Sequence, residues 1–236
     1  MLLVGGRGTR LGPVCDMLPK PLLPIAGKPF LEHIVHSLVK QGVRRLFFLT
    51  GYFGEQVEAY FAKRPLPGVS YSFVQEVKPL GTGGSVRAAL ESTGVRGRFL
   101  LLNGDSFVPF PIARLVDAAR HCAGALLAGE ARDARRYGSL EVSPEGMLKG
   151  FAEKRGGKAA QLLVNLGVYC LSPELFWQFP SGRQYSIETD FYPAWVAAGE
   201  KLAVIKVNCN FIDIGTPESL REAEKFVTDL QDKEIM

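Results

Sequence analysis

The chain has 236 residues, of which 47% are hydrophobic and 22% are charged. This is ordinary globular composition, and the length is sufficient to bury one sizeable core. Charged residues interrupt every apolar run well short of the roughly 18 to 20 residues that cross a bilayer, and the long apolar segment of a secretory signal is missing. We therefore expect a single domain spanning residues 1–236, a cytoplasmic location and no membrane partner.

The charge and the cysteine pattern exclude further classes. The formal net charge is only +4, and the basic residues are scattered, which disfavours a nucleic-acid partner but suits small anionic substrates. His33 and His36 lie three apart on a predicted helix without a third metal ligand nearby, so we interpret them as ordinary surface or core residues. The cysteines form no CxxC pair and are expected to be buried or half-buried thiols: Cys15, Cys122, Cys170 and Cys209.

The first half alternates short apolar runs with amphipathic ones. In chain order, we expect a strand at residues 1–4, a helix from Pro29 to Gly42, a strand at 45–50, a helix at 55–62, a strand at 69–74, a helix at 86–90 after a loop at 79–84, and a strand at 99–102. This alternation is typical of an α/β fold, in which helices cover both faces of a mainly parallel sheet.

The second half has a different pattern. We expect a β-hairpin at 139–151 around the turn at 143–146, a strand at 163–171, helices at 173–179 and 189–198, strands at 202–207 and 211–214, and a closing helix at 217–230. Because no linker or repeat divides the chain, we expect this half to extend the same mixed sheet.

A glycine-rich segment, Gly5 to Arg10, directly follows the first predicted strand. Glycines at such a place let backbone N–H groups surround phosphate oxygens, and Arg10 and Lys20 supply positive charge. Leu11 stands where a dinucleotide-binding motif has its third glycine, and no Walker Lys-Ser or Lys-Thr pair follows. The alternative interpretation is a tight strand-to-loop turn.

Two aspartates, Asp105 and Asp213, lie in or just after apolar strands. Ligands of α/β sheets bind at the carboxyl ends of strands, and Mg²⁺ is commonly held by one or two carboxylates together with substrate phosphates. As the structural alternatives, Asp105 could cap a turn and Asp213 could accept backbone hydrogen bonds.

A second glycine-rich loop runs from Glu76 to Gly84, where backbone groups could approach a base or a ribose and Thr82 could donate a hydrogen bond. By itself it is more typical of a loop-to-helix junction. Tyr137-Gly138, Glu153-Lys154, Asn165 to Gly167, and Glu188 are weaker signals, each an ordinary surface or turn feature in isolation.

Taken in order, these motifs resemble those of the sugar-phosphate nucleotidylyltransferases. The resemblance rests on the following segments: Gly5 to Leu11, Pro19-Lys20-Pro21, Leu80-Gly81-Thr82-Gly83, Asn103-Gly104-Asp105, Glu153-Lys154, Asn165 to Tyr169, and Phe211 to Pro217. It implies a Rossmann-like fold of the GT-A type. Residues 20–32, 79–84 and 185–190 are most similar to short bacterial members that activate D-glycero-α-D-manno-heptose 1-phosphate with GTP.

The resemblance also implies a role for each matched residue. Residues 1–135 would form a nucleotide-binding half and 136–236 a sugar-phosphate-binding half. The implied catalytic residues are Arg10, Lys20 and Asp105, with Mg²⁺ held by Asp105 and Asp213. The implied nucleotide-binding residues are Leu3, Gly5, Gly6, Gly8, Thr9, Arg10, Lys20, Glu76, Gly81, Thr82 and Gly104. The implied sugar-phosphate-binding residues are Tyr137, Gly138, Glu153, Lys154, Asn165, Gly167 and Glu188.

The chain departs from the family pattern at both ends. Only residues 1–4 precede the paired glycines, so we expect either a truncated start or a short first strand. We expect no hexapeptide-repeat acyltransferase activity, because one helix is all that is predicted after Pro217. The expected partners are small-molecule substrates, and a homodimer is compatible with the sequence. Two alternatives remain: a uridylyl- or thymidylyltransferase acting on a hexose or amino-sugar 1-phosphate, and a non-catalytic nucleotide-sugar sensor.

Overall fold

The computed structural model of the chain describes residues 1–131, 139–152 and 162–232. The chain divides into two compact units, each built from separate stretches of sequence. The first unit comprises residues 1–79, 102–109 and 210–236, and the second comprises 80–101 and 110–209. These units are discontinuous, so they differ from the predicted functional halves, 1–135 and 136–236, which stay a prediction.

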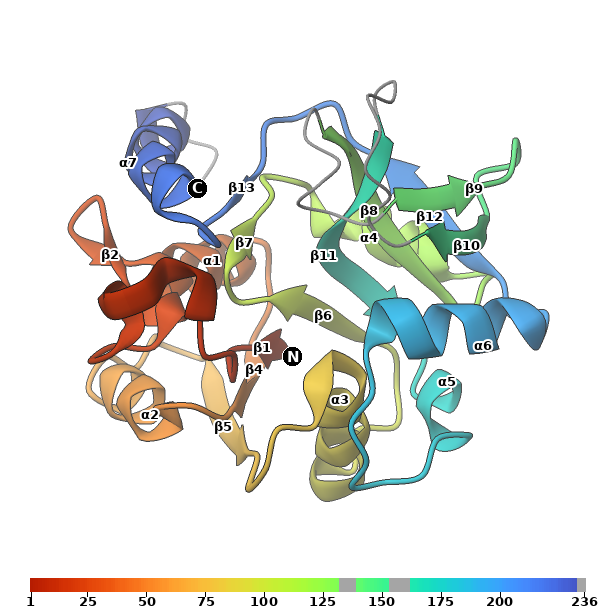
Figure 1. Cartoon of the computed structure of the whole chain (residues 1–236), viewed down its shortest axis with the longest axis horizontal. Coiled ribbons are helices and arrows are strands. Elements are labelled where there is room, and N and C mark those ends of the chain that lie inside the picture. Colours follow the sequence, from red (N-terminus) through yellow and green to blue (C-terminus); the bar gives the residue numbers. More distant parts are fainter. Residues whose placement is uncertain (132–138, 153–161, 233–236) are drawn as a thin grey trace. The chain divides into compact units, whose positions relative to one another are not determined.

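The first unit is built on parallel strands (Figure 1). β1 (Leu2–Leu3) pairs with β4 (Arg45–Thr50) and with the end of β6 (Phe99–Asn103), and β4 pairs with β5 (Ser70–Gln75). Two small antiparallel pairs, β2 (Pro24–Ile25) with β3 (Lys28–Pro29) and β7 (Ser106–Phe107) with β13 (Ile212–Asp213), complete its strands. Its helices are α1 (Phe30–Lys40), α2 (Gly54–Ala62) and α7 (Pro217–Asp232), together with the 3₁₀ segments η1 (Thr9–Cys15) and η2 (Lys20–Leu22).

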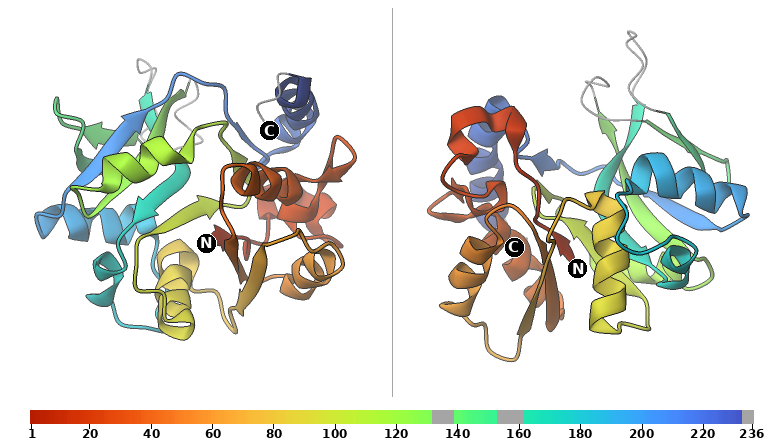
Figure 2. Two further views of the ribbon diagram at one scale, coloured as in Figure 1. Left: turned by 180° about the vertical axis from the view of Figure 1, so that it is seen from behind. Right: turned by 60° about the horizontal axis from the view of Figure 1, so that its bottom comes forward.

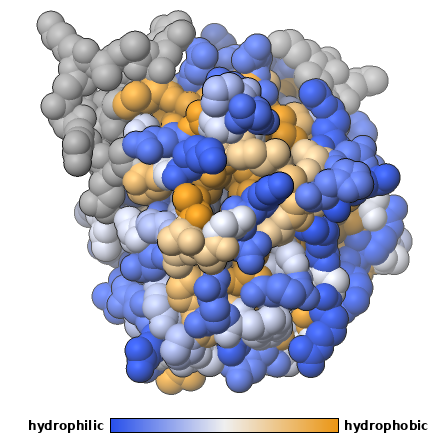
Figure 3. All heavy atoms as spheres, turned by 90° about the vertical axis from the view of Figure 1, so that its right-hand side faces the viewer, coloured by the Kyte–Doolittle hydropathy of each residue, from blue (hydrophilic) through white to orange (hydrophobic). Residues whose placement is uncertain are grey.

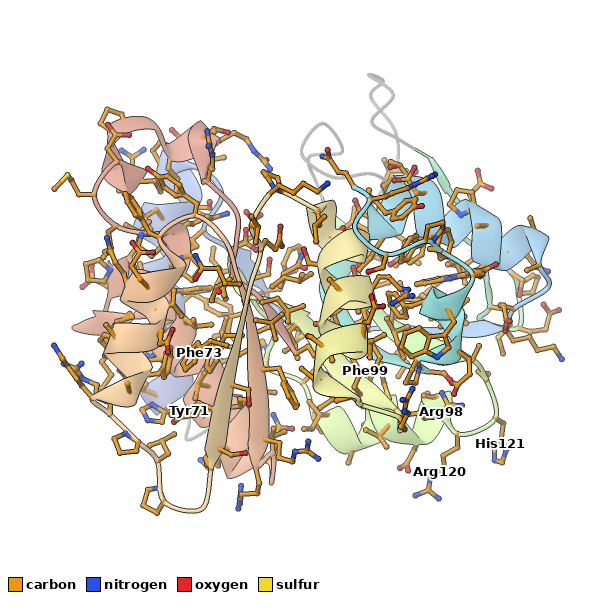
Figure 4. The ribbon with its side chains drawn as sticks, turned by 90° about the horizontal axis from the view of Figure 1, so that it is seen from below. Tyr71, Phe73, Arg98, Phe99, Arg120 and His121 are labelled. Carbon is orange, nitrogen blue, oxygen red and sulfur yellow. The ribbon has the colours of Figure 1, made fainter. Side chains whose placement is uncertain are left out.

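Aromatic rings hold α2 against the strands of the first unit. Phe48 of β4 stacks on Phe73 of β5 at 5.1 Å between ring centroids and meets Phe61 of α2 at 4.7 Å. Tyr71, also on β5, meets the Phe61 ring edge-on, and both labelled β5 rings point toward α2 in Figure 4. Such rings bury large apolar areas, so they hold α2 against β4 and β5.

The second unit has a mixed sheet. β8 (Gly124–Ala131) lies between β11 (Leu162–Leu171), which is antiparallel to it, and β12 (Leu202–Lys206), which is parallel. β9 (Ser139–Val142) pairs with β11 and forms a hairpin with β10 (Leu148–Ala152). The helices are α3 (Gly81–Thr93), α4 (Ile112–Ala119), α5 (Glu174–Trp177), the π-helical turn η3 (Ile187–Phe191) and α6 (Tyr192–Ala197). Figure 2 shows the helices of each unit flanking its strands.

The core of the second unit is an aromatic cluster. Phe191 stacks on Phe179 at 3.8 Å between centroids, and Trp195 packs edge-on against Phe176 at 5.4 Å. Trp195 is fully buried, and its indole N–H donates to the carbonyl of Leu175 at 2.7 Å. A buried indole N–H needs such a partner, so this bond fixes α6 against α5.

The sequence predicts most elements but not all of them. The α/β fold with a mixed sheet is confirmed, and the first strand is short, as expected. The helix predicted at 86–90 begins earlier, because residues from Gly81 onward are already helical and the expected loop keeps only its first residues. α4, β7 and β8 were not predicted.

The close packing of the α3 glycines explains the longer helix. A side chain at Gly83 would meet the Phe191 ring at 2.9 Å, and one at Gly84 would meet the carbonyl oxygen of Arg183 at 2.4 Å. These glycines therefore let α3 pack closely against its neighbours. The glycine-rich sequence alone predicts a loop, because it does not reveal these tertiary contacts.

The face of the molecule in Figure 3 is mostly polar. Figure 3 shows hydrophilic residues spread over the face drawn there, with smaller hydrophobic areas between them. In the part of the chain that the structure describes, none of the helices combines the length and the apolar character that crossing a bilayer requires.

Candidate active site

The glycine-rich loop after β1 lies against the loop after β4. A side chain at Gly5 would meet the backbone nitrogen of Gly51 at 3.0 Å, and one at Gly51 would meet the carbonyl oxygen of Gly5 at 2.9 Å. That carbonyl accepts the amide N–H of Tyr52 at 3.2 Å. Two facing glycines are the means by which the two backbones approach this closely, so the loop is fixed at its first residue.

Gly8 controls the other end of the loop. Its φ of 64° is left-handed, and a side chain there would lie 2.8 Å from Cys15 Sγ. Cys15 is buried with Leu11 and Leu23, and burial raises the pKa of its thiol although Lys20 opposes the shift. The thiol is therefore a neutral packing group beneath the loop, as predicted for the cysteines.

The loop borders a cavity of about 200 Å³ within the first unit. The cavity brings together seven of the predicted nucleotide-binding or catalytic residues: Leu3, Gly6, Gly8, Thr9, Arg10, Lys20 and Asp105. Val4, Pro21 and Gly215 also line it and were not predicted. Gly215 could have been identified from the Ile214-Gly215-Thr216 segment, because a glycine directly after a strand permits close approach.

Gly5 and Gly104 lie beside the cavity rather than in its lining. Gly104 donates its amide N–H to the carbonyl of Leu3 at 2.9 Å. A side chain at this position would meet Val4 Cγ1 at 2.5 Å, so glycine lets the turn after β6 close onto β1. This contact brings Asp105 to the end of β1, where the glycine-rich loop begins.

Lys20 and Asp105 form an ion pair in the cavity. Lys20 Nζ lies 2.6 Å from Asp105 Oδ2, and the Ser106 hydroxyl donates to Asp105 Oδ1 at 3.2 Å. The Lys20 side chain is only 10% exposed, whereas that of Asp105 is 37% exposed. The lysine charge is thus held at a fixed place while the carboxylate stays accessible to a ligand.

Asp213 lies next to this pair through the β7–β13 pairing. Asp213 is opposite Ser106 in the register, and the amide of Ile214 donates to the carbonyl of Asp105 at 3.0 Å. A Cβ at Gly215 would lie 2.5 Å from Asp213 Oδ1 and 3.4 Å from Lys20 Nζ, so these groups are adjacent. Asp213 Oδ1 also accepts the Gly215 amide at 2.8 Å, which is the structural role considered for it.

These residues match the chemistry of a magnesium site completed by substrate. Mg²⁺ prefers carboxylate oxygens and keeps several positions for water and phosphate, so two carboxylates are a sufficient protein contribution. Among the described residues no group of three or more His, Cys, Asp or Glu side chains could hold a metal, so any protein contribution at this site is the two carboxylates.

The second predicted glycine-rich loop is divided between the units. Glu76 follows β5, and its amide donates to the carbonyl of Thr50 at 2.9 Å in the first unit. Gly81 and Thr82 begin α3 in the second unit, where the Thr82 hydroxyl accepts the amide N–H of Ile187 at 3.0 Å. A side chain at Gly81 would meet the Tyr185 carbonyl oxygen at 2.5 Å. A role of these three residues in base binding stays a prediction.

The second unit joins the described members of the predicted sugar-phosphate site. The Asn165 amide group donates to Glu188 Oε1 at 2.8 Å, and Asn165 Oδ1 accepts the amide N–H of Gly167 at 3.0 Å. Gly167 has a φ of 70°, a left-handed conformation that favours glycine. The predicted site residues Tyr137, Gly138, Glu153 and Lys154 lie outside the described residues.

Comparison with known proteins places the chain among well-defined relatives. Residues 1–230 match the family described as Nucleotidyl transferase. The chain is 32% identical over 219 residues to the D-glycero-alpha-D-manno-heptose 1-phosphate guanylyltransferase of Campylobacter jejuni, covering 92% of this chain and 95% of that one. It is 32% identical over 229 residues to the protein of the same name from Aneurinibacillus thermoaerophilus, covering 95% and 96%. The crystal structure of HddC from Yersinia pseudotuberculosis complexed with GMP-PN has a TM-score of 0.83 and 29% identity, covering 95% of this chain and 97% of that one.

Proposed function

Because the chain belongs to the nucleotidyl transferase family, we propose that it joins a nucleoside triphosphate to a sugar 1-phosphate, giving a nucleotide sugar and pyrophosphate. The observation that carries the proposal is the cavity of the first unit, where the glycine-rich loop, Arg10, Lys20 and Asp105 line one space. A cavity with backbone amides, two cations and an accessible carboxylate suits a polyphosphate.

We take GTP and D-glycero-α-D-manno-heptose 1-phosphate as the substrates. Two relatives at 32% identity carry guanylyltransferase names with this sugar phosphate, and a structure at 29% identity contains GMP-PN. Both relatives are matched over nearly their whole length, which supports proposing their substrates for this chain.

The reaction demands alignment and charge neutralisation rather than a protein nucleophile. A phosphate oxygen of the sugar 1-phosphate attacks the α-phosphorus, the bond from the α-phosphorus to the bridging oxygen breaks, and pyrophosphate leaves with the electron pair. No group on the protein needs to take up a proton. The backbone amides around Gly6 and Gly8 would hold the triphosphate in line, and Arg10 would offset its charge.

Lys20 is suited to contact the leaving pyrophosphate. An ammonium group has three N–H donors, so it can bond Asp105 and a phosphate oxygen together. The ion pair at 2.6 Å holds its flexible side chain in the cavity before substrate arrives. A preorganised cation of this kind stabilises developing charge without further ordering.

Asp105 and Asp213 would hold Mg²⁺, which when bound supplies charge neutralisation between the two anionic substrates. The accessible Asp105 carboxylate and the adjacent Asp213 on the paired strand support this assignment.

The test is pyrophosphate release from the purified protein with GTP, UTP, dTTP, CTP or ATP against heptose, mannose, glucose and N-acetylated sugar 1-phosphates. Each reaction is run with Mg²⁺ and with a chelator. Strong turnover with GTP and the heptose phosphate alone, lost in chelator, is the expected result. Strong turnover with a different nucleoside triphosphate and sugar 1-phosphate would replace the proposed substrates, for example by those of a uridylyl- or thymidylyltransferase. Binding of a nucleotide sugar without turnover would favour a sensor.

Two variants link turnover to the cavity. Asp105→Asn should remove most of the turnover, and Lys20→Ala should do the same by removing the phosphate-neutralising charge. Asp117→Asn is the matched control, because this exposed carboxylate on α4 pairs with Arg120 at 3.0 Å and does not line the cavity. Near-normal rates in Asp105→Asn would refute the role of the cavity.

A further inference from the structure

Asn165 is held by three hydrogen bonds within the second unit. Its Nδ2 donates to the Tyr169 hydroxyl at 2.5 Å and to Glu188 Oε1 at 2.8 Å, and its Oδ1 accepts the amide N–H of Gly167 at 3.0 Å. An amide NH₂ has two donor hydrogens, so both of them already have protein partners. The amide orientation is fixed as well, because a flip would turn Nδ2 toward the Gly167 N–H.

A break in the sheet register makes the contact with Tyr169 possible. β11 advances from Asn165 to Tyr169 while β8 advances only from Ala128 to Leu126. Residues four apart in a regular strand would be separated by about 13 Å. The bulge, with left-handed Gly167 inside it, shortens this path and lets the Tyr169 hydroxyl reach Asn165.

Tyr169 is suited to hold another group because it is buried and neutral. Its residue exposure is only 2%. Burial, and then the nearby charge of Glu188, raise the pKa of Tyr169, so its phenol is protonated at neutral pH. The aromatic ring is fixed in the core, and the hydroxyl oxygen is therefore a stationary acceptor for Asn165.

We propose that Tyr169 is a positioning residue for sugar 1-phosphate binding, which orients the Asn165 amide and, through it, the Glu188 carboxylate. This inference rests on the proposed function and assigns Tyr169 an indirect role, since it lies behind Asn165. Without the hydroxyl, one Nδ2 hydrogen loses its acceptor, and two hydrogen bonds instead of three hold the amide. The donor that faces Glu188 is then less firmly oriented, and the Glu188 carboxylate samples more orientations before the sugar binds.

The test is the kinetics of Tyr169→Phe, which keeps the ring and removes the hydroxyl. We expect the KM for the sugar 1-phosphate to rise about three- to tenfold, the range that loss of one ordinary hydrogen bond produces. The KM for the nucleoside triphosphate should stay within about twofold, because the triphosphate would bind at the loop of the first unit. A purely structural defect would lower activity without separating the two constants.

Tyr192→Phe is the matched control. Tyr192 is also a fully buried tyrosine, and its hydroxyl lies against that of Tyr169, but the Asn165 amide donates to Tyr169 and Glu188 instead of to Tyr192. We expect this variant to change stability and leave the KM for the sugar 1-phosphate within about twofold. An equal rise in both variants would overturn the proposal, because any lost buried hydroxyl would then have the same effect.

A second variant tests the route through Asn165. Asn165→Leu should raise the same KM, and adding Tyr169→Phe to it should produce no further rise, because the hydroxyl would have nothing left to orient. If the rise in KM in the double variant equals the product of the rises in the two single variants, the two residues act independently, and the proposal is overturned. If Tyr169→Phe fails to fold, Asn165→Leu still breaks the same hydrogen bond from the other side, and an unchanged KM for the sugar 1-phosphate in that variant would overturn the proposal.

A crystal structure of Tyr169→Phe separates this inference from the proposed function. Rotation of the Asn165 amide and displacement of Glu188 are the expected results, and unchanged side chains would refute the positioning role. If the unaltered protein turns over no sugar 1-phosphate, the proposed function fails, while the crystal structure still decides whether Tyr169 orients Asn165.

Discussion

The ion pair between Lys20 and Asp105 should stabilise the folded protein before any substrate binds. A double-mutant cycle with Lys20→Met, Asp105→Asn and the double variant isolates the interaction between the two charges. Each single variant should lower the free energy of unfolding, because each removes the attraction between the two charges at 2.6 Å. The double variant should recover part of the loss, since neither charge then remains.

The size of the coupling follows from the distance and the burial. At the observed 2.6 Å, Coulomb's law gives about 6 kcal/mol for an effective dielectric constant of about 20 and about 1.6 kcal/mol for about 80. The Asp105 side chain is 37% exposed, so solvent screens the pair from one side, and burial of the Lys20 charge opposes the attraction. We therefore expect a coupling of about 2 kcal/mol.

The assay is urea unfolding of the four proteins in chelator and without nucleotide, so that no ligand adds to the stability. The matched control is the same cycle on Asp117 and Arg120, which lie 3.0 Å apart with side chains 60% and 69% exposed. That surface pair should couple by no more than about 0.5 kcal/mol.

A coupling for Lys20 and Asp105 as small as that of the surface pair would refute the reasoning. It would mean that burial of the lysine does not strengthen the attraction, and that the pair is not preorganised for phosphate. A more stable Asp105→Asn would refute it in another way, because repulsion between Asp105 and Asp213 would then exceed attraction to Lys20.

Two further predictions concern the loop and a buried histidine. In urea unfolding, Gly8→Ala should lower the free energy of unfolding by more than Gly94→Ala does. Both positions have a left-handed φ, which costs an alanine about 1–2 kcal/mol. Only an alanine at position 8 would also place its Cβ 2.8 Å from Cys15 Sγ. Burial lowers the pKa of His33, whose Nε2 lies 2.9 Å from the Ile25 carbonyl oxygen, so the unfolded chain binds a proton more readily than the fold. The free energy of unfolding should therefore fall as the pH drops below about 6.5, and His33→Gln should flatten this decline.

Each of these predictions can fail clearly. Equal losses for Gly8→Ala and Gly94→Ala would mean that the loop moves away from Cys15 at no cost. Stability curves against pH that coincide for the unaltered protein and His33→Gln would mean that burial does not suppress protonation of His33. His36→Gln, at a half-exposed position on the same helix, is the control and should leave the decline in place.

Local signals in the sequence were sufficient for most of the elements. The apolar run at 45–50 is β4 residue for residue, and the amphipathic segment after Pro29 is α1. Such elements depend on periodicity and on residues at their own ends, which the sequence contains. The glycine-rich segment at 5–10 also lies where it was expected, because it directly follows a buried strand.

Local signals failed where packing decides the conformation. The glycine content of residues 81–84 predicts a loop, yet contacts with Phe191 and with the backbone at Arg183 make these glycines favourable inside α3. Tertiary contacts thus outweigh the low helix propensity of glycine.

The sequence determined which residues are available for the chemistry, and the tertiary structure decided which of them meet. Lys20 and Asp105 are far apart in the chain, and nothing local to either predicts a contact of 2.6 Å. Their meeting depends on the turn after β6 closing onto β1, and the pairing of β13 with β7 adds Asp213. The role of Tyr169 likewise depends on a bulge in β11, because hydrogen bonds between distant segments form only when the strands select one register.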